Sequence, residues 1–232
     1  ENTFRFGSCK TNKTFKGAGS PMLSVLSWPV VDDIRNRYTE AGGRRTLGTL
    51  LSAELDNPLW AMENNPNSDE VSRVTGNYGL DYKPTNWLSF QLRAGVDVYT
   101  LQGLSGYHPE AYNANIAGSY TGGGMNTFNN NKVLYNGTFV ANAKKNYGKF
   151  SANLNLGYDI SDDRDQTTAQ FGSRFYQSGF FSLNNTDPTT QRVQYTDIYK
   201  RKMGVFAQAL LGYDDMLYLS FIGRQDFSST LS

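Results

Sequence analysis

Long runs of alternating apolar and polar residues are the feature that most constrains the fold of this chain. From Leu88 to Val98, every even position is apolar. The odd positions between them include Gln91, Arg93 and Asp97. Successive side chains of a β-strand point to opposite faces, so this period of two describes a strand with one apolar and one polar face. A helix would need a period near 3.6 residues, which the run lacks.

Six segments share this pattern, and we expect each of them to form a strand. They cover about residues 71–83, 87–99, 132–145, 149–160, 197–213 and 217–224. Most of them are longer than the ~5–6 residues usual for strands of soluble proteins. They have about the ~9–11 residues that a tilted strand needs to cross a bilayer.

Short and long connections alternate along the chain. A short turn such as Asn146–Lys149 joins the two strands of each pair, whereas the stretches of about 100–131 and 161–196 are long and polar. Short periplasmic turns and longer extracellular loops are typical of outer-membrane barrels. The sequence therefore predicts an all-β fold in which residues 71–232 form hairpins of a transmembrane antiparallel β-barrel, with these two stretches as extracellular loops.

The composition fits a wall that is apolar on one side only. Hydrophobic residues make up 38% of the chain and aromatic residues 14%. Aromatic residues near expected strand ends, such as Tyr82, Trp87 and Tyr158, fit the girdles of membrane interfaces. No run of about 18 apolar residues occurs, so we expect no transmembrane helix. A soluble β-sandwich remains the alternative, but such long strands with long loops on one side only are unusual there.

Residues 1–70 lack long alternation, and Pro21, Pro29 and Pro58 argue against regular strands in this part. We expect them to supply part of another strand and a long extracellular loop. Six strands are too few to close a transmembrane barrel, which needs about 8, and an open edge in lipid would leave backbone groups without partners. We therefore expect this chain to be part of a larger barrel.

Several segments resemble the SusC/RagA family of TonB-dependent outer-membrane transporters. The segments that carry the resemblance are Asn57–Trp60, Arg73–Asn77, Trp87–Tyr99, Gly204–Leu219 and, most specifically, Gly223–Leu231. In the last of them, the family usually has Asn at the place of Gln225, Trp at Phe227 and, just beyond, Pro at Ser232. These departures from the pattern are mild.

The resemblance implies a 22-stranded barrel with an N-terminal plug domain, in the outer membrane of a Gram-negative bacterium. It also implies import of glycans, peptides or similar large nutrients, with a SusD-like lipoprotein as a lid. The plug and the segment that contacts TonB have no counterpart in these residues, so TonB would act through parts outside this chain. The alternative is a SusC-like structural subunit of an outer-membrane assembly or secretion complex without import activity.

Polar side chains opposite the apolar set are the candidates to face the barrel lumen. These candidates are Arg73, Asn77, Asp81, Gln91, Arg93, Asp97, Asn142, Asn153, Asn155 and Gln208. In the first long loop, Tyr107, Tyr112 and Tyr120 are candidates to contact a substrate or a lid protein.

The sequence offers no catalytic, metal or cofactor site. The only histidine, His108, and the only cysteine, Cys9, are far apart in sequence and make no dyad by themselves. The acidic run Asp162–Asp165 lacks EF-hand spacing and contains an arginine, so we expect a solvated acidic loop rather than a calcium site. A net charge of +1 gives no electrostatic reason to expect nucleic acid. We expect a protein that is not an enzyme.

Overall fold

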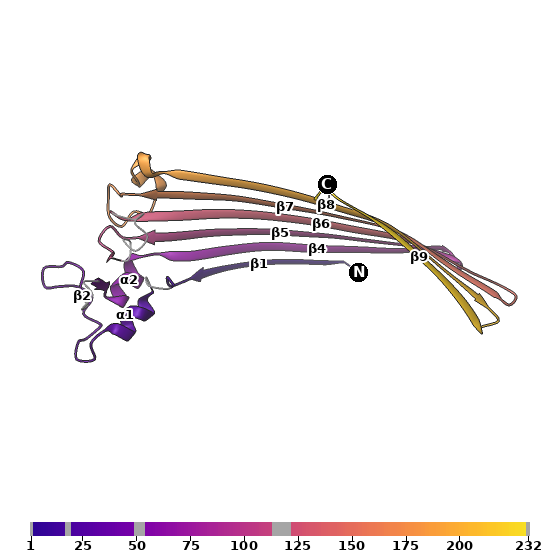
Figure 1. Cartoon of the computed structure of the whole chain (residues 1–232), viewed down its shortest axis with the longest axis horizontal. Helices are drawn as coiled ribbons and strands as arrows, with labels where there is room; N and C mark the ends of the chain where they lie inside the picture. Colours follow the sequence, from indigo (N-terminus) through magenta and orange to yellow (C-terminus); the bar gives the residue numbers. More distant parts are fainter. Residues whose placement is uncertain (1, 17–19, 49–53, 113–121, 231–232) are drawn as a thin grey trace.

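The computed structural model describes residues 2–16, 20–48, 54–112 and 122–230, and its main feature is one antiparallel sheet of seven strands (Figure 1). In sheet order, the strands are β1 (Thr3–Asn12), β4 (Asn67–Thr85), β5 (Leu88–Tyr107), β6 (Gly124–Tyr147), β7 (Phe150–Ser173), β8 (Arg192–Tyr213) and β9 (Leu217–Ser228). From β4 onward, each strand pairs with the next one along the chain, and β1 pairs with β4. The predicted antiparallel all-β fold is confirmed.

One face of the sheet carries an apolar band that is continuous from strand to strand. Val74, Val98 and Val133 are cross-strand partners in one row at its upper limit. On β5 the band runs from Leu88 to Val98, or about 11 residues at ~3.3 Å each. At a tilt of ~45° its height is ~25 Å, which matches the apolar belt of outer-membrane barrels.

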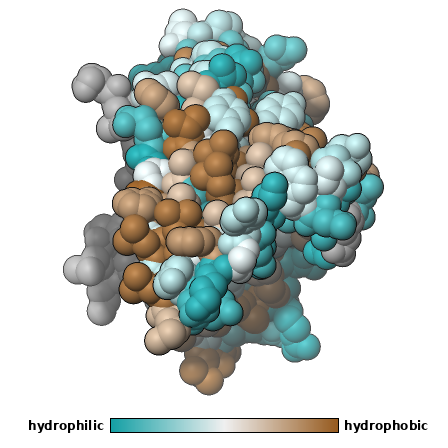
Figure 2. Space-filling view, turned by 90° about the vertical axis from the view of Figure 1, so that its right-hand side faces the viewer, coloured by the Kyte–Doolittle hydropathy of each residue, from teal (hydrophilic) through white to brown (hydrophobic). Residues whose placement is uncertain are grey.

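The two ends of the sheet differ in structure. All the short turns lie at one end, and the helices and long connections lie at the other (Figure 1). Figure 2 views the molecule from the turn end, where hydrophobic side chains gather together over one part of the surface. Leu217 and Phe221 of β9 belong to the apolar face and are more than half exposed. Such exposure of large apolar side chains fits a surface that lipid covers.

The strands extend well beyond the apolar band, so the two long loops are much shorter than predicted. The first connection runs from 108 to 123 instead of 100–131, because β5 continues to Tyr107 and β6 already begins at Gly124. The second runs from 174 to 191 instead of 161–196. The predictions failed here because both faces are polar beyond the band. Apolar alternation then disappears, although the backbone ladder of hydrogen bonds continues.

The N-terminal part contains more regular structure than predicted. Besides β1, it forms α1 (Pro21–Ser27), the short strands β2 (Thr46–Gly48) and β3 (Glu54–Asp56), and α2 (Pro58–Asn64). Pro21 and Pro58 begin the two helices, a position at which the missing N–H of proline costs nothing. The 3₁₀ helices η3 (Leu183–Asn185) and η4 (Pro188–Thr190) lie between β7 and β8. None of the helices in the described segments has the length and apolar character required to cross a membrane.

Candidate functional site

All ten residues predicted to face the lumen lie on one face of the sheet, opposite the apolar band. Partners in an antiparallel ladder have their side chains on the same side. Odd positions of β4 pair with odd positions of β5, and these pair with even positions of β6. Even positions of β6 pair with odd positions of β7, which pair with even positions of β8. We call this surface the polar face; that it lines a lumen stays a prediction.

Two ion pairs on the polar face join β4 to β5. Arg73 donates from Nε to Oδ1 of Asp97 at 2.9 Å and from Nη2 to Oδ2 at 2.5 Å. Arg93 donates from Nη2 to both carboxylate oxygens of Asp81, at 3.0 and 2.9 Å. The two-pronged geometry of the first pair fixes the orientation of both side chains. All four residues were predicted site residues, and the structure brings them together as pairs.

Three predicted asparagines form a second group on the same face. The Nδ2 atom of Asn142 donates to Oδ1 of Asn153 at 2.7 Å and to Oδ1 of Asn155 at 2.5 Å. This amide cluster joins β6 to β7, so seven of the ten predicted residues take part in contacts between strands. Gln91 and Gln208 lie on the same face.

A hollow of about 510 Å³ lies on the polar face around Gly95. The amides of Asn77 and Asn136 border it, together with the Arg93–Asp81 pair. A Cβ added at Gly95 would lie 2.1 Å from Oδ1 of Asn136, so the bare backbone of the glycine is what leaves room for that amide. With amide groups and an ion pair on its walls, the hollow suits a polar ligand bound by hydrogen bonds.

The sequence prediction missed further charged residues of the polar face. Lys132 pairs with Asp163 across β6 and β7 at 3.3 Å. Arg224 of β9 pairs with Asp159 at 2.9 Å and also with Asp226. Lys132, Asp159 and Arg224 lie within predicted strands, at positions that alternation assigns to this face, but they were not among the lumen candidates. Asp163 and Asp226 lie just beyond the predicted strand ends.

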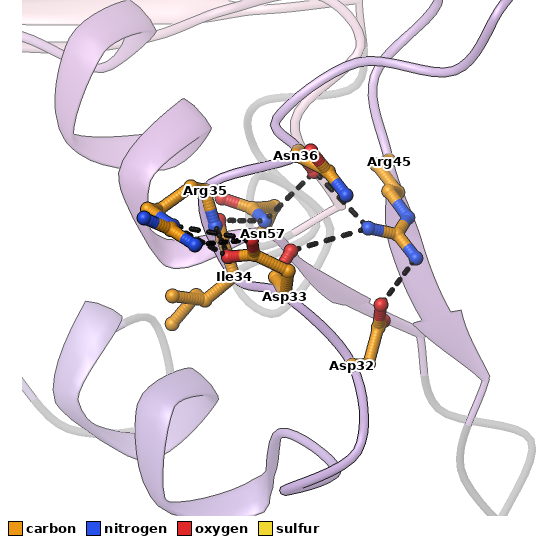
Figure 3. A network of polar contacts seen from close by, with 7 residues as sticks. All are labelled: Asp32, Asp33, Ile34, Arg35, Asn36, Arg45 and Asn57. Carbon is orange, nitrogen blue, oxygen red and sulfur yellow. Dashed lines mark hydrogen bonds and ion pairs between the residues drawn. The ribbon is translucent and has the colours of Figure 1, made fainter.

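Asn57 is fully buried and joins the connections at the end of the sheet that carries the helices (Figure 3). We call this end the outer end, because the sequence predicts that its long connections are extracellular. The Oδ1 atom of Asn57 accepts hydrogen bonds from the backbone N–H groups of Leu59 and Trp60, at 3.0 and 3.1 Å, and so caps α2. Its Nδ2 donates to the carbonyl oxygens of Ile34 and Asn36, at 2.8 and 3.3 Å. One side chain therefore holds both a helix and a loop.

Asp56, which is also fully buried, connects the same region to the β5–β6 connection. It forms an ion pair with Arg44, and its Oδ2 accepts a hydrogen bond from the backbone N–H of Tyr112 at 2.8 Å. Nearby, the side chain and backbone N–H of Arg35 bond to Asp33 and lower the pKa of that carboxyl to about 2 (Figure 3). The outer end is thus held mainly by charged and amide groups.

The described part of the structure does not bring the predicted loop tyrosines together into one site. Tyr107 is the last residue of β5, and its ring stacks on that of Phe15 at a centroid distance of 4.4 Å. Tyr112 is joined to Asp56 through its backbone. Tyr120 lies outside the described residues. These contacts give Tyr107 and Tyr112 a part in ordering the connection; contact with a substrate or lid stays a prediction.

His108 is half-buried at the start of the same connection. Its ring meets that of Trp60 edge-on at 5.3 Å, and its Nδ1 accepts a hydrogen bond from the backbone N–H of Glu110 at 3.3 Å. Its backbone N–H donates to Oδ1 of Asn65 at 2.8 Å. Burial lowers the pKa of His108.

The Asp162–Asp165 run is part of β7 and not a loop, contrary to prediction. Its acidic groups therefore diverge, because neighbouring positions of a strand face opposite sides. Asp162 pairs with Arg201 on one face, whereas Asp163 pairs with Lys132 on the other. No cluster of three or more metal-binding side chains occurs within the described segments.

Solved structures of the RagAB peptide transporter match this chain over nearly its whole length. One has a TM-score of 0.72 and 16% sequence identity, and covers 100% of this chain and 26% of the transporter chain. The chain has the fold of a SusC/RagA-type barrel wall. The "open-open" and "closed-closed" states of the RagAB peptide importer match 98% of this chain and 26% of theirs, with TM-scores of 0.70 and 0.66 and identities of 17% and 15%.

No family model and no curated protein matches the chain. The chain spans about a quarter of the length of the RagAB transporter chains that it matches. At identities of 15–17%, these matches establish the fold of the SusC/RagA-type wall, and the activity, substrates and partners of the whole protein are matters for proposal.

Proposed function

We propose that this chain is a wall segment of a TonB-dependent importer of peptides, glycans or similar large nutrients in the outer membrane of a Gram-negative bacterium. The observation that carries the proposal is the two-faced sheet with the RagAB fold. One face has an apolar band of ~25 Å, the height of an outer-membrane belt. The opposite face carries ion pairs such as Arg73–Asp97 and an amide cluster.

In this proposal, outer-membrane lipid covers the apolar band and the polar face borders the path of the substrate. Cross-strand ion pairs neutralise each other and keep the wall rigid, while amides such as Asn77 and Asn136 offer hydrogen bonds. Peptides, the substrate named for RagAB, carry many donors and acceptors that such groups can bind. Glycans share this property, so the wall supports a large polar nutrient.

The proposed partners lie at the two ends of the wall. A SusD-like lipoprotein would rest as a lid on the outer end, where the network around Asp56 and Asn57 makes the connections firm. TonB would act through parts of the protein outside this chain. The proposal includes no enzymatic step and no nucleic acid.

Uptake by cells that produce the full-length protein tests the proposal. Labelled peptides and oligosaccharides should enter such cells, and uptake should stop when either this gene or the gene for TonB is deleted. Uptake that persists without TonB contradicts energy-coupled import. A protein that takes up none of the probes and purifies with secretion components would instead be a structural subunit.

A further inference from the structure

Beyond the apolar band, the same face of the sheet continues as a polar surface that we call the collar. The collar begins directly above the row Val74–Val98–Val133, with Ser72, Thr100 and Asn131 as the next outward-facing row. Its further members above the row of Val133 are Lys10, Glu70, Gln102, Asn129, Thr168, Gln170, Tyr195 and Asp197. On β7 and β8 the collar reaches lower, because Arg164 and Tyr199 lie in the row of Val133, and Asp162 and Arg201 lie in the row of Tyr135. Because these side chains point the same way as the apolar band, the collar faces away from the barrel interior.

The height of the collar places it at the level of sugars rather than of lipid tails. Gln102 lies four residues beyond Val98 on β5, which is ~13 Å along the strand and ~9 Å along the membrane normal at a ~45° tilt. The headgroup layer of a bilayer leaflet is only about 5–8 Å thick. In the outer leaflet of the outer membrane, the groups at and beyond this level are the core sugars of lipopolysaccharide.

A hollow of about 540 Å³ lies in the collar and is lined mainly by amide and hydroxyl groups. Five of its eleven lining residues form one cross-strand row: Lys10, Glu70, Gln102, Asn129 and Thr168. The Oδ1 atom of Asn129 is buried and receives no hydrogen bond from the described residues, so a turn of its amide would present an acceptor to a ligand. Such groups match the hydroxyls of a sugar.

The charges of the collar favour hydroxyl groups over phosphates as the groups that it contacts. In the described part, its cations Lys10, Arg164 and Arg201 are balanced by its anions Glu70, Asp162 and Asp197. Arg201 lies 2.6 Å from Asp162, and Arg164 lies 2.7 Å from Asp197. Paired arginines have little attraction left for the phosphates of lipid A, whereas hydrogen bonds to sugar hydroxyls need no net charge.

Tyrosines extend the hollow toward β8. Tyr195 is the cross-strand partner of Thr168 and so continues the same row, and its side chain is 60% exposed. Tyr199, half exposed, lies four residues nearer the band on β8, in the row of Val133. A tyrosine ring offers an apolar face together with a hydroxyl, the combination that suits the amphipathic face of a sugar ring at a wet interface.

We propose that the collar hollow binds the core oligosaccharide of lipopolysaccharide and thereby anchors the wall among the sugars of the outer leaflet. The bound groups are sugar hydroxyls, held by Gln102, Thr168 and Gln170 and flanked by Tyr195. This inference rests on the outer-membrane location in the proposed function. It gives a binding role to the outward surface above the apolar band, whereas import concerns the opposite face.

The test uses the full-length protein in detergent and two probes: lipid-free core oligosaccharide and lipid A. The wild-type protein should bind the oligosaccharide. The double variant Gln102→Met/Thr168→Val keeps the side-chain volumes but removes the hydrogen-bonding groups, so its affinity should fall about tenfold or more. The matched control Gln194→Met/Thr196→Val makes the same exchanges on the polar face and should bind like wild type.

The inference is overturned if the wild-type protein binds lipid A but not the oligosaccharide. It is also overturned if the Gln102→Met/Thr168→Val variant binds the oligosaccharide with wild-type affinity.

Should this variant fail to insert, Gln102→Cys in a Cys9→Ser background provides a second measurement. Saturating oligosaccharide should slow maleimide labelling of this cysteine about tenfold, and an unchanged labelling rate contradicts the inference. Membrane fractionation and nutrient uptake are measured in parallel. A protein that inserts and imports but binds no oligosaccharide refutes only this inference, whereas one absent from the outer membrane refutes the proposed function.

Discussion

The ring of Phe206 on β8 lies across the backbone of Gly157, its cross-strand partner on β7. A Cβ added at Gly157 would lie 1.9 Å from Cζ of Phe206. The same arrangement occurs between Phe128 and Gly103, where the added Cβ would lie 2.1 Å from the ring. Both pairs are on the polar face. In each of them an aromatic ring covers the bare glycine backbone of the neighbouring strand, a device that also fixes the register of the sheet.

Gly157→Ala should therefore destabilise the wall. The new methyl group must displace the Phe206 ring, and such overpacking typically costs about 1–3 kcal/mol. The measurement is the unfolding midpoint of the full-length protein in detergent, compared with that of Gly223→Ala, whose added Cβ meets nothing within 4 Å. Equal midpoints for the two variants would show that the ring moves aside freely.

The sequence predicted the part of the fold in which one face of the sheet is apolar and the other polar. Such a sheet requires strict alternation, so the strand through Leu88–Val98 and the common face of Arg73 and Asp97 followed from the positions alone. Beyond Val98 the same strands carry polar side chains on both faces, such as Gln102 and Ser105, and alternation no longer marks them. That is why residues 124–131, now the beginning of β6, were predicted as loop.

The outer-end network was beyond prediction for a different reason. Asn57 bonds to the backbone of Ile34 and Asn36, more than 20 residues away, and backbone carbonyls leave no mark in the sequence. Only the local cap of α2 had a signal, namely an asparagine followed by Pro58. The pairing of Asp56 with Arg44 likewise depends on how the chain returns in space.

Two substitutions at Asn57 separate its two roles. Asn57→Ser keeps an acceptor for the cap of α2 but loses the two donated bonds to the 34–36 segment, so only that segment should loosen. Asn57→Ala loses both functions and should cost about 1–2 kcal/mol more locally. Limited proteolysis with peptide mapping distinguishes the two variants. Both should be cut near residues 34–36, whereas only the alanine variant should be cut in α2. Identical cleavage maps for the two would argue against a separate capping role.

His108 should make the outer connection sensitive to acid. Burial lowers its pKa below the ordinary 6.5, and Arg44 acts in the same direction, against the opposing effects of Glu110 and Asp56. The open form therefore takes up a proton first, so the packed form is fully stable above pH 6.5 and loses stability as the pH falls below it. As the pH falls from 7.5 to 5, protease cleavage near residue 108 and quenching of Trp60 fluorescence should both increase. His108→Gln should remove this pH dependence, and a persisting transition would assign it to another group.

Asn153 and Leu154 are neighbours on β7 and provide the most direct test of which face meets water. Asn153 lies on the polar face with the predicted lumen residues, and Leu154 lies in the apolar band. In a Cys9→Ser background, with the full-length protein in intact outer membranes, Asn153→Cys should react with a water-soluble maleimide. Leu154→Cys should not, because a thiol surrounded by lipid cannot form the reactive thiolate. After denaturation both variants should label equally, which controls for the presence of the thiol. If only Leu154→Cys were labelled, the face with Leu154 would be the one that meets water. That result would remove the basis for a polar transport path along this wall.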